Sequence, residues 1–145
     1  MNTEIAKNKK AYFDYEFLER FEAGLVLTGA EIKSIRAKHA QLAGSYVKIL
    51  LGKNKKPELF AVNINIANSP EPTQTRKLLV HKKELSHLIG KVEQKNLTLI
   101  PLRLYLKKNR WAKLEFALAR GRKKFDKREL LKKRDQERDL KNKFA

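Results

Sequence analysis

The chain has 145 residues with 41% hydrophobic content, enough for one domain with its own core and too little to expect two. Its 34 Lys and Arg residues against 16 Asp and Glu residues give a net charge of +18, which favours a polyanionic partner: nucleic acid first, an anionic membrane surface second. The absence of cysteine excludes disulfides and thiolate catalysis, and no apolar run or leader pattern indicates membrane insertion or secretion, so we expect a cytoplasmic protein.

The N-terminal part of the sequence predicts a flexible start and then a long strand. Residues 1–10 are polar and basic, so we expect them to be flexible and order to begin near Ala11. Apolar and aromatic residues occupy almost every odd position of 13–27, an alternation typical of a strand. A short helix through 17–21 is the alternative, and Gly24 is a candidate for a bulge in the strand.

A helix and a β-hairpin are predicted next. Thr28 and Glu31 have the spacing of a capping box, and the apolar residues that follow predict a helix over 29–38. Residues 45–51 and 58–66 are rich in β-branched and aromatic side chains and flank a basic, turn-like segment. They therefore predict two strands of a hairpin with an exposed basic loop.

The remaining elements of the body are a loop, a helix and a second hairpin. Two prolines without apolar periodicity predict a loop over 68–75, and apolar residues at helical spacing predict a helix over 82–95, broken or bent near Gly90. Alternation over 100–106 and 111–118 predicts a hairpin with one face in the core and the other presented. Several short strands interrupted by helices predict a mainly β fold, with a small closed barrel of the OB type as one option.

The character of the sequence changes at the C-terminal end. Residues 120–143 carry a net charge of +7, which leaves +11 on the rest of the chain. Acidic and basic residues four apart favour a helix there, but the apolar residues form no continuous stripe that a body could bury. We therefore expect three parts: a flexible N-terminus (1–10), a folded body (11–120), and a basic tail (121–145) that is disordered alone and helical on a partner.

Residues suited to catalysis are scarce. Only His39, His81 and His87 offer imidazole groups, and none stands at a metal-ligand spacing with acidic companions. The sequence has no Gly-rich phosphate loop, no nucleophile elbow and no close pair of carboxylates in an apolar setting. We expect a protein that is not an enzyme. A ribonuclease with His81 as base is the enzyme alternative, but no second acid or base can be named for it.

Two segments of the body are candidates for contact with RNA. Residues 76–83 place four Lys and Arg residues around an apolar stretch, which favours phosphate contact over the alternative of a solvated strand-to-helix junction. The non-core face of the second hairpin alternates rings for stacking with cations, at Arg103, Tyr105, Trp111 and Lys113. Packing of Trp111 over a barrel edge is the alternative there, which leaves Lys113 as the stronger candidate.

Glu22 and the start of the tail add two further candidates. Glu22 lies opposite the apolar face of its predicted strand, where it can accept hydrogen bonds from base or ribose donors. Glu31, by contrast, already has a role in the capping box. Residues 121–128 place Phe125 between two cationic clusters, so that its ring can stack while the cations hold a phosphate backbone; the alternative is a charge run that is only solvated.

Several short blocks of the sequence form a pattern that extends along nearly the whole chain. The blocks are Asn-Lys-Lys-Ala at 8–11, Phe-Glu-Ala-Gly-Leu-Val-Leu-Thr-Gly at 21–29, Glu-Ile-Lys-Ser-Ile-Arg at 31–36, Ser-Tyr-Val at 45–47, Thr-Arg-Lys-Leu-Leu at 75–79, Glu-Leu at 84–85, Pro-Leu at 101–102, Leu-Tyr at 104–105 and Lys-Lys-Phe-Asp-Lys-Arg at 123–128. Together, and in this order, they resemble the SmpB family of SsrA-binding proteins. Chance agreement of so many separate blocks is implausible.

The resemblance implies an OB-type closed antiparallel barrel with two or three external helices and a flexible basic tail. It also implies that the protein binds the tRNA-like domain of transfer-messenger RNA, meets elongation factor Tu through the alanylated RNA, and enters stalled ribosomes, where the tail acts in the decoding centre and empty messenger channel. No cofactor or metal is implied. A ribosomal or initiation-factor-like OB protein that binds ribosomal RNA is the alternative.

The candidate site residues fall into two groups. The RNA-binding candidates of the body are Glu22, Glu31, Lys33, Arg36, Arg76, Lys77, Leu78, Leu79, Val80 and Lys113. The resemblance points most directly, position by position, to Glu22, to 78–80 and to Lys113. The ribosome-contacting candidates of the tail are Lys123, Lys124, Phe125, Asp126, Lys127 and Arg128.

Overall fold

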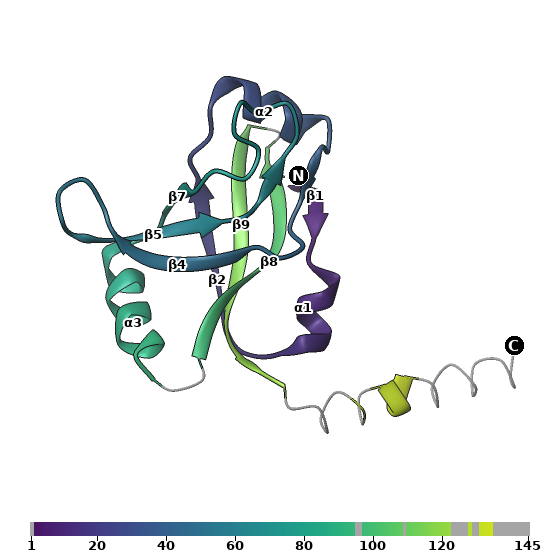
Figure 1. Cartoon of the computed structure of the whole chain (residues 1–145), viewed down its shortest axis with the longest axis vertical. Helices are drawn as coiled ribbons and strands as arrows, with labels where there is room; N and C mark the ends of the chain where they lie inside the picture. The colour runs from purple at the N-terminus through teal and green to yellow at the C-terminus, as the bar shows by residue number, and fades with distance from the viewer. Residues whose placement is uncertain (1, 95–96, 109, 123–127, 129–130, 135–145) are drawn as a thin grey trace, which may run out of the picture.

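The computed structural model describes residues 2–94, 97–108, 110–122, 128 and 131–134. The elements in these ranges are β1 (Asn2–Lys7), α1 (Lys9–Asp14), β2 (Tyr15–Leu25), α2 (Gly29–Arg36), β3 (Ala40–Gln41), β4 (Tyr46–Leu51), β5 (Pro57–Val62), β6 (Asn65–Ile66), β7 (Arg76–Leu79), α3 (Lys82–Val92), β8 (Leu97–Lys107) and β9 (Trp111–Gly121). Figure 1 shows a ring of strands with α1, α2 and α3 placed around it.

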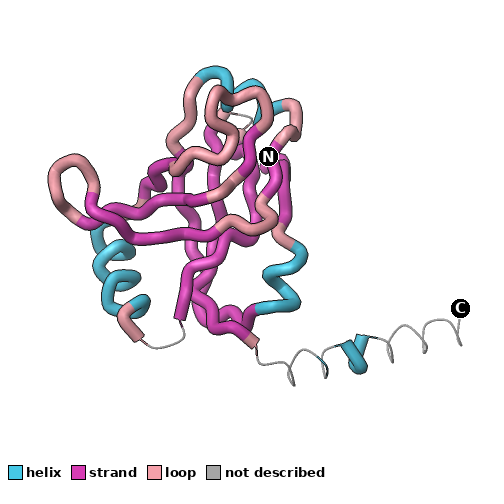
Figure 2. Tube along the Cα trace, viewed as in Figure 1, coloured by secondary structure: helices cyan, strands magenta, loops and turns pink. Residues whose placement is uncertain are grey.

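The strands close into a barrel. The order of hydrogen-bonded neighbours is β8-β4-β5-β7-β2-β9, and β9 pairs again with β8, so the ring has no free edge along that path. Every pairing in it is antiparallel. The joint between β4 and β8 is narrow, with Val47 opposite Leu99, whereas β9 pairs along most of its length with both β2 and β8. The predicted OB-type antiparallel barrel is thus confirmed, and Figure 2 shows how strands dominate the body.

The N-terminal segment is ordered, against the prediction of flexibility over 1–10. Residues Asn2–Lys7 form β1, which pairs antiparallel with the outer edge of β8. Asn8 then fastens the chain: its backbone N–H donates to the Leu102 carbonyl at 2.8 Å, and its side-chain amide donates to the Pro101 carbonyl at 2.9 Å. Polar composition did not prevent order because an edge strand is held by backbone hydrogen bonds, whichever side chains it carries.

The predicted strand over 13–27 is present as β2, which excludes the helical alternative, but α1 occupies its first positions. The bulge expected at Gly24 lies instead at Leu18, where the pairing with β9 shifts register. Gly24 stays within the ladder, opposite Lys113 of β9 and Leu79 of β7. This alignment places residues of three strands side by side.

A second bulge, at Leu102, corrects the prediction that the last hairpin has one core face. Ile100, which precedes the bulge, and Leu102, at the bulge itself, pack with Ala11 of α1 in a small second core separate from the barrel core. After the bulge, Leu104 and Leu106 face the barrel interior with Leu114, Phe116 and Leu118. An added residue in one strand makes the side chains that follow it point to the opposite face of the sheet. An unbroken alternation in the sequence can therefore contribute to two separate cores.

The helices and the first hairpin follow the sequence closely. Thr28 caps α2, and the predicted capping box with Glu31 is present in both directions. The β4–β5 hairpin pairs as expected, with Leu51 opposite Pro57 at its tip. α3 buries Leu88 in the barrel core and runs unbroken through Gly90, so the predicted bend is absent.

Candidate RNA-binding surface

A buried ion pair joins α2 to β7 beneath the candidate surface. The Arg76 Nη2 atom lies 2.6 Å from the Glu31 Oε2 atom, and Arg76 Nε donates to the same oxygen at 2.8 Å. Glu31 is 0% exposed and Arg76 is 3% exposed. Arg76 Nη1 donates to the Ile64 carbonyl, and Nη2 also donates to the Pro72 carbonyl. The pair therefore ties the long loop before β7 to the first turn of α2.

Glu31 remains ionised in this interior position. Burial acts to raise its pKa, but hydrogen bonds from Arg76, from the Thr28 backbone and from Gln74 outweigh that effect and hold the pKa of Glu31 below its ordinary value. Direct contact of Glu31 or Arg76 with RNA, as predicted from sequence, conflicts with this burial. Their side chains are enclosed by protein partners and support the surface from beneath.

The surface itself centres on a groove of about 380 Å³ between the ends of β2 and β7 and the start of β9. Three large apolar side chains line it while exposed to solvent: Val26 at 47%, Leu79 at 55% and Trp111 at 49%. The Arg110 guanidinium lies over the Trp111 ring, 5.4 Å from its centroid. Exposed apolar residues gathered in one groove indicate a binding site rather than scattered surface.

Gly24 lines the groove, and side chains of the two neighbouring strands lie close to it. It has no side chain, and the neighbouring strands fill the space: a Cβ atom at Gly24 would lie 3.6 Å from Leu79 Cβ and 3.9 Å from Lys113 Nζ. The Lys113 ammonium group and the Leu79 side chain thus both lie next to Gly24, which has no side chain of its own. Such a pair offers a cation for a phosphate and a surface for a base or ribose within one contact area.

Tyr105 of β8 lies opposite Lys113 and is 2% exposed, so the predicted stacking role of its ring is not available. Its hydroxyl donates a hydrogen bond to the Glu22 carboxylate. Burial is the main cause that raises the pKa of Tyr105, and this hydrogen bond is the second. Glu22 itself is exposed on β2. The predicted acceptor is therefore present at the surface and is held by a neutral donor from beneath.

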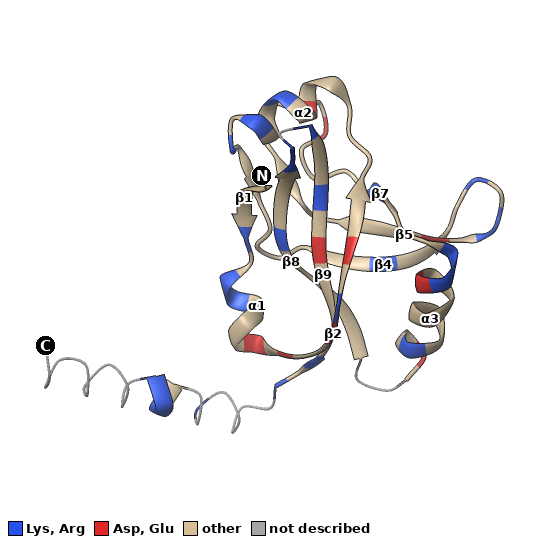
Figure 3. Cartoon of the chain, turned by 180° about the vertical axis from the view of Figure 1, so that it is seen from behind, with Lys and Arg blue, Asp and Glu red and all other residues tan. Residues whose placement is uncertain are grey.

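Charged residues occupy neighbouring positions of β2 and β9, as the blue and red segments of these strands show in Figure 3. Glu115 of β9 is opposite Glu22 and would repel it, but Arg103 Nη2 lies 3.2 Å and Arg20 Nη1 lies 3.5 Å from the Glu115 carboxylate. The Arg103 guanidinium also covers the Tyr105 ring at 4.9 Å. The two arginine side chains neutralise the charge of Glu115, which reduces its repulsion of the Glu22 carboxylate.

The other predicted residues occupy different positions. Lys33 and Arg36 are exposed on α2, and Lys77 is exposed on β7, where its Nζ lies 3.3 Å from a Glu58 oxygen. Leu78 is a core residue and Val80 packs partly against the core. Of the tail candidates, Arg128 is exposed and helical, while Lys123, Lys124, Phe125, Asp126 and Lys127 lie outside the described residues.

Sequence reasoning missed Val26 and Arg110 as groove residues. Val26 directly follows β2 and occupies an even position, on the face that the alternation over 13–27 assigned to solvent, so an apolar residue there was a usable signal. Arg110 lies in a turn, and its approach to Trp111 depends on how that turn folds. No periodicity in the sequence could have indicated it.

His81, the base of the ribonuclease alternative, is exposed at the N-cap of α3. His87 forms a surface contact with Glu19, with 2.7 Å between Nε2 and Oε2.

Across the part of the chain that the structure describes, no three His, Cys, Asp or Glu side chains group so as to hold a metal ion. None of the helices described there is long and apolar enough to span a membrane.

A closed antiparallel barrel with an apolar groove, flanking cations and a held carboxylate defines an RNA-binding protein of the OB type. Comparison with known proteins is more specific. Residues 5–145 match the family model described as SmpB protein, and the chain belongs to that family. It is 47% identical to the SsrA-binding protein of Mycoplasma mycoides over 147 residues, with 95% of each chain covered. It is 48% identical to that of Nitratiruptor sp. over 141 residues, covering 93% of this chain and 92% of the relative.

A solved structure supports the same assignment. A chain of the structure described as "tmRNA-SmpB: a journey to the center of the bacterial ribosome" is 42% identical to this one. The two superpose with a TM-score of 0.66, covering 81% of this chain and 84% of that chain.

Proposed function

We propose that this protein binds the tRNA-like domain of transfer-messenger RNA and promotes its delivery to stalled ribosomes for trans-translation, as a binding protein without catalytic activity. The observation that carries the proposal is the groove, where Leu79 and Lys113 meet over Gly24 beside exposed Trp111. Membership of the SmpB family, whose relatives are named SsrA-binding proteins, identifies the RNA.

The groove suits RNA with unstacked nucleotides. Sequence-tolerant binding of such RNA combines stacking on apolar or aromatic side chains with cations that follow the backbone. Leu79 and Trp111 supply the first, and Lys113 and Arg110 supply the second. Glu22 is an acceptor for ribose hydroxyl or exocyclic amino donors, which phosphate-only contact would not use. Lys33 and Arg36 of α2 extend the positive surface.

The tail is assigned to the ribosome in this proposal, acting in the decoding centre and the empty messenger channel. It continues directly from β9, and its described residues Arg128, Lys132, Lys133 and Arg134 are exposed cations on helical backbone. A basic helix is suited to a channel lined by phosphates. Elongation factor Tu would meet the protein through the alanylated RNA, in the cytoplasm where translation occurs.

A binding titration at controlled salt tests the proposal. The full chain is titrated with the tRNA-like domain of transfer-messenger RNA in the presence of an equal-length RNA duplex, because non-specific affinity depends strongly on salt. We expect tight binding that survives the competitor and intact RNA at the end of the incubation. Equal affinity for the two RNAs would reduce the protein to a generic basic OB protein, and cleavage would restore the ribonuclease alternative.

A further inference from the structure

A second pocket lies away from the groove, and the two have no lining residue in common. It has a volume of about 370 Å³, within the range of sites for small molecules and single nucleotides. It opens where β4 separates from β8 beyond their contact at Val47 and Leu99, and α1 forms its opposite side. Its lining residues come from the segment around α1, from the chain leading into β4 and from the first half of β8.

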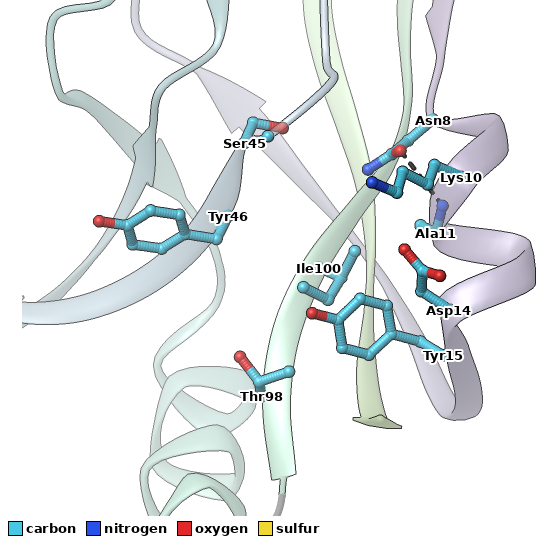
Figure 4. Close-up of a pocket in the computed structure, with 10 residues that line it drawn as sticks. Asn8, Lys10, Ala11, Asp14, Tyr15, Ser45, Tyr46, Thr98 and Ile100 are labelled. Atoms are coloured by element: carbon cyan, nitrogen blue, oxygen red, sulfur yellow. Dashed lines mark hydrogen bonds between the residues drawn. The ribbon is translucent and has the colours of Figure 1, made fainter. Parts of the chain in front are cut away.

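The pocket has two chemically different walls, shown in Figure 4. On the α1 side lie Asn8, Lys10, Asp14 and Tyr15, and on the other side lie the hydroxyl groups of Ser45 and Thr98. Ile100 lies between the walls and, with Ala11, provides an apolar surface. The Tyr46 ring points away from the opening, so this residue lines the pocket without closing it.

The α1 wall is held in place. Asn8 uses both ends of its side chain, donating to the Pro101 carbonyl at 2.9 Å and accepting from the Ala11 N–H at 3.3 Å. The wall thus has a fixed backbone, on which Lys10 presents an ammonium group and Asp14 presents a carboxylate to the same opening. A carboxylate has two oxygens and about four acceptor sites, so it can accept from a ligand in addition to any protein donor.

We propose that this pocket receives an unpaired guanine of the RNA on which the protein acts. The Watson–Crick edge of guanine carries two adjacent N–H donors and one carbonyl oxygen, and a carboxylate beside an ammonium group complements that pattern. Adenine offers an acceptor where guanine offers its ring N–H, and pyrimidines cover less of the Ile100 and Tyr15 surface. The Thr98 hydroxyl suits ribose as donor or acceptor, whereas the Ser45 hydroxyl already donates to the Leu42 carbonyl and can only accept from a ribose hydroxyl.

The pocket is also connected to the base of the tail. The Arg122 backbone N–H donates to the Asp14 carbonyl at 2.8 Å, and Arg122 Nε donates to the Tyr15 carbonyl at 3.3 Å. A guanine bound in the pocket beside Asp14 and Tyr15 would therefore lie near Arg122, where the tail leaves the barrel. The inference rests on the proposed function for the identity of the RNA, but the binding chemistry of the pocket can be measured without that RNA.

The test is an NMR titration of the full ¹⁵N-labelled chain with each of the four ribonucleoside 5′-monophosphates and with ribose 5-phosphate. We expect saturable shifts of the Ala11, Ser45 and Thr98 amides with guanosine monophosphate, a dissociation constant in the millimolar range, and at least several-fold weaker binding of the other ligands. Equal shifts with all four nucleotides, shifts confined to the Trp111 groove, or no saturable shift would each overturn the proposal.

Variants separate the pocket from general charge effects and from the groove. Asp14→Asn should abolish the preference for guanine, and Thr98→Val should weaken binding while keeping the preference. Glu16→Gln is the matched control, because Glu16 pairs with Arg120 and does not line the pocket. Lys113→Ala should weaken binding of the tRNA-like domain and leave guanosine monophosphate binding intact. Failure of the tRNA-like domain to bind would contradict the proposed function alone.

Discussion

The Tyr105 hydroxyl, buried beneath the sheet surface, donates its hydrogen bond to the exposed carboxylate of Glu22. Because burial and this bond raise the pKa of Tyr105, the hydroxyl stays protonated throughout the pH range in which the protein functions. Tyr105→Phe should therefore remove one hydrogen bond without changing any charge. We expect about a 3- to 10-fold loss of affinity for the tRNA-like domain, corresponding to about 1 kcal/mol for the bond.

A double-mutant cycle with Glu22→Gln distinguishes positioning from a general loss of stability. If Tyr105 acts by holding Glu22, the affinity loss in the double variant should be clearly smaller than the sum of the single losses. Tyr12→Phe is the control for removal of a hydroxyl elsewhere, because Tyr12 lies on α1 and packs against the second core. Strict additivity would remove Tyr105 from the binding surface and leave it a packing residue.

Lys113→Ala should weaken RNA binding and flatten its dependence on salt. One lost phosphate contact lowers the slope of log affinity against log salt concentration by about 0.9 or less. The measurement is a titration series at several salt concentrations, with Lys48→Ala as the control because Lys48 is exposed on β4, outside the groove. An unchanged slope for Lys113→Ala would mean that its ammonium group contacts no phosphate.

Leu79→Ala should also weaken RNA binding at this groove, but without changing its dependence on salt. Leu79 is exposed, so its truncation costs little folding stability, but it removes the apolar surface that a base or ribose would cover. We expect affinity to fall by about 1–3 kcal/mol, the range for apolar contact area of a leucine side chain, with the salt slope unchanged. A steeper or flatter slope would indicate that the RNA backbone, rather than a base, lies over Leu79.

The Glu31–Arg76 pair should control stability and its dependence on acid. The folded-state pKa of Glu31 lies below its ordinary value of 4.5, so its contribution is present above that pH and is lost as the pH falls through the folded pKa. Glu31→Gln leaves Arg76 buried without its charge partner, which costs about 3–5 kcal/mol. Urea unfolding between pH 7 and pH 3 should show lower stability and a weaker pH dependence for the variant.

The surface pair of Glu58 and Lys77 provides the control for that experiment. It has similar chemistry but lies in solvent, so Glu58→Gln should change the free energy of unfolding by at most about 1 kcal/mol. The outcome that contradicts us is a similar small loss for both variants. RNA affinity of any folded Glu31→Gln protein should fall only through movement of β7 and α2.

Removal of the tail should separate binding from ribosome rescue. The cut belongs after Arg122, because Gly121 still pairs with Tyr15 and the Arg122 N–H is bonded to Asp14. We expect a protein lacking residues 123–145 to unfold at an unchanged urea concentration and to bind the tRNA-like domain normally. Peptide tagging on stalled ribosomes should be lost. Loss of the folded barrel, or normal tagging, would contradict the division of labour proposed here.

Local signals in the sequence were sufficient for most of the elements. The capping box of Thr28 and Glu31, the alternation in β2, and the hairpins β4–β5 and β8–β9 each depend on residues close in the chain. The resemblance to a known family then supplied the barrel, which no local pattern could establish. The groove was half predicted, because Leu79 and Lys113 were candidates before their meeting over Gly24 could be known.

The misses have a common cause in long-range pairing. β1 carries little apolar signal because its order comes from the backbone of β8, some hundred residues away. The burial of Arg76 depends on Glu31 and on carbonyls of a loop, and an arginine in a basic segment gives no sign of such an interior place. A bulge such as that at Leu102 leaves the alternation intact and changes only what each face meets.

The pairing of β1 with β8 also limits when the strands can pair during synthesis of the chain. Asn2 lies opposite Lys107, and the ring is completed by β9, so β1 finds its partner strand only after about a hundred further residues have been synthesised. Such non-local contacts slow folding, because the entropy of closing a long loop is lost before the contacts repay it. A nascent chain interrupted before β9 would leave the β8 edge that pairs with β9 free and the ring open, so the barrel closes only after β9 itself has been synthesised.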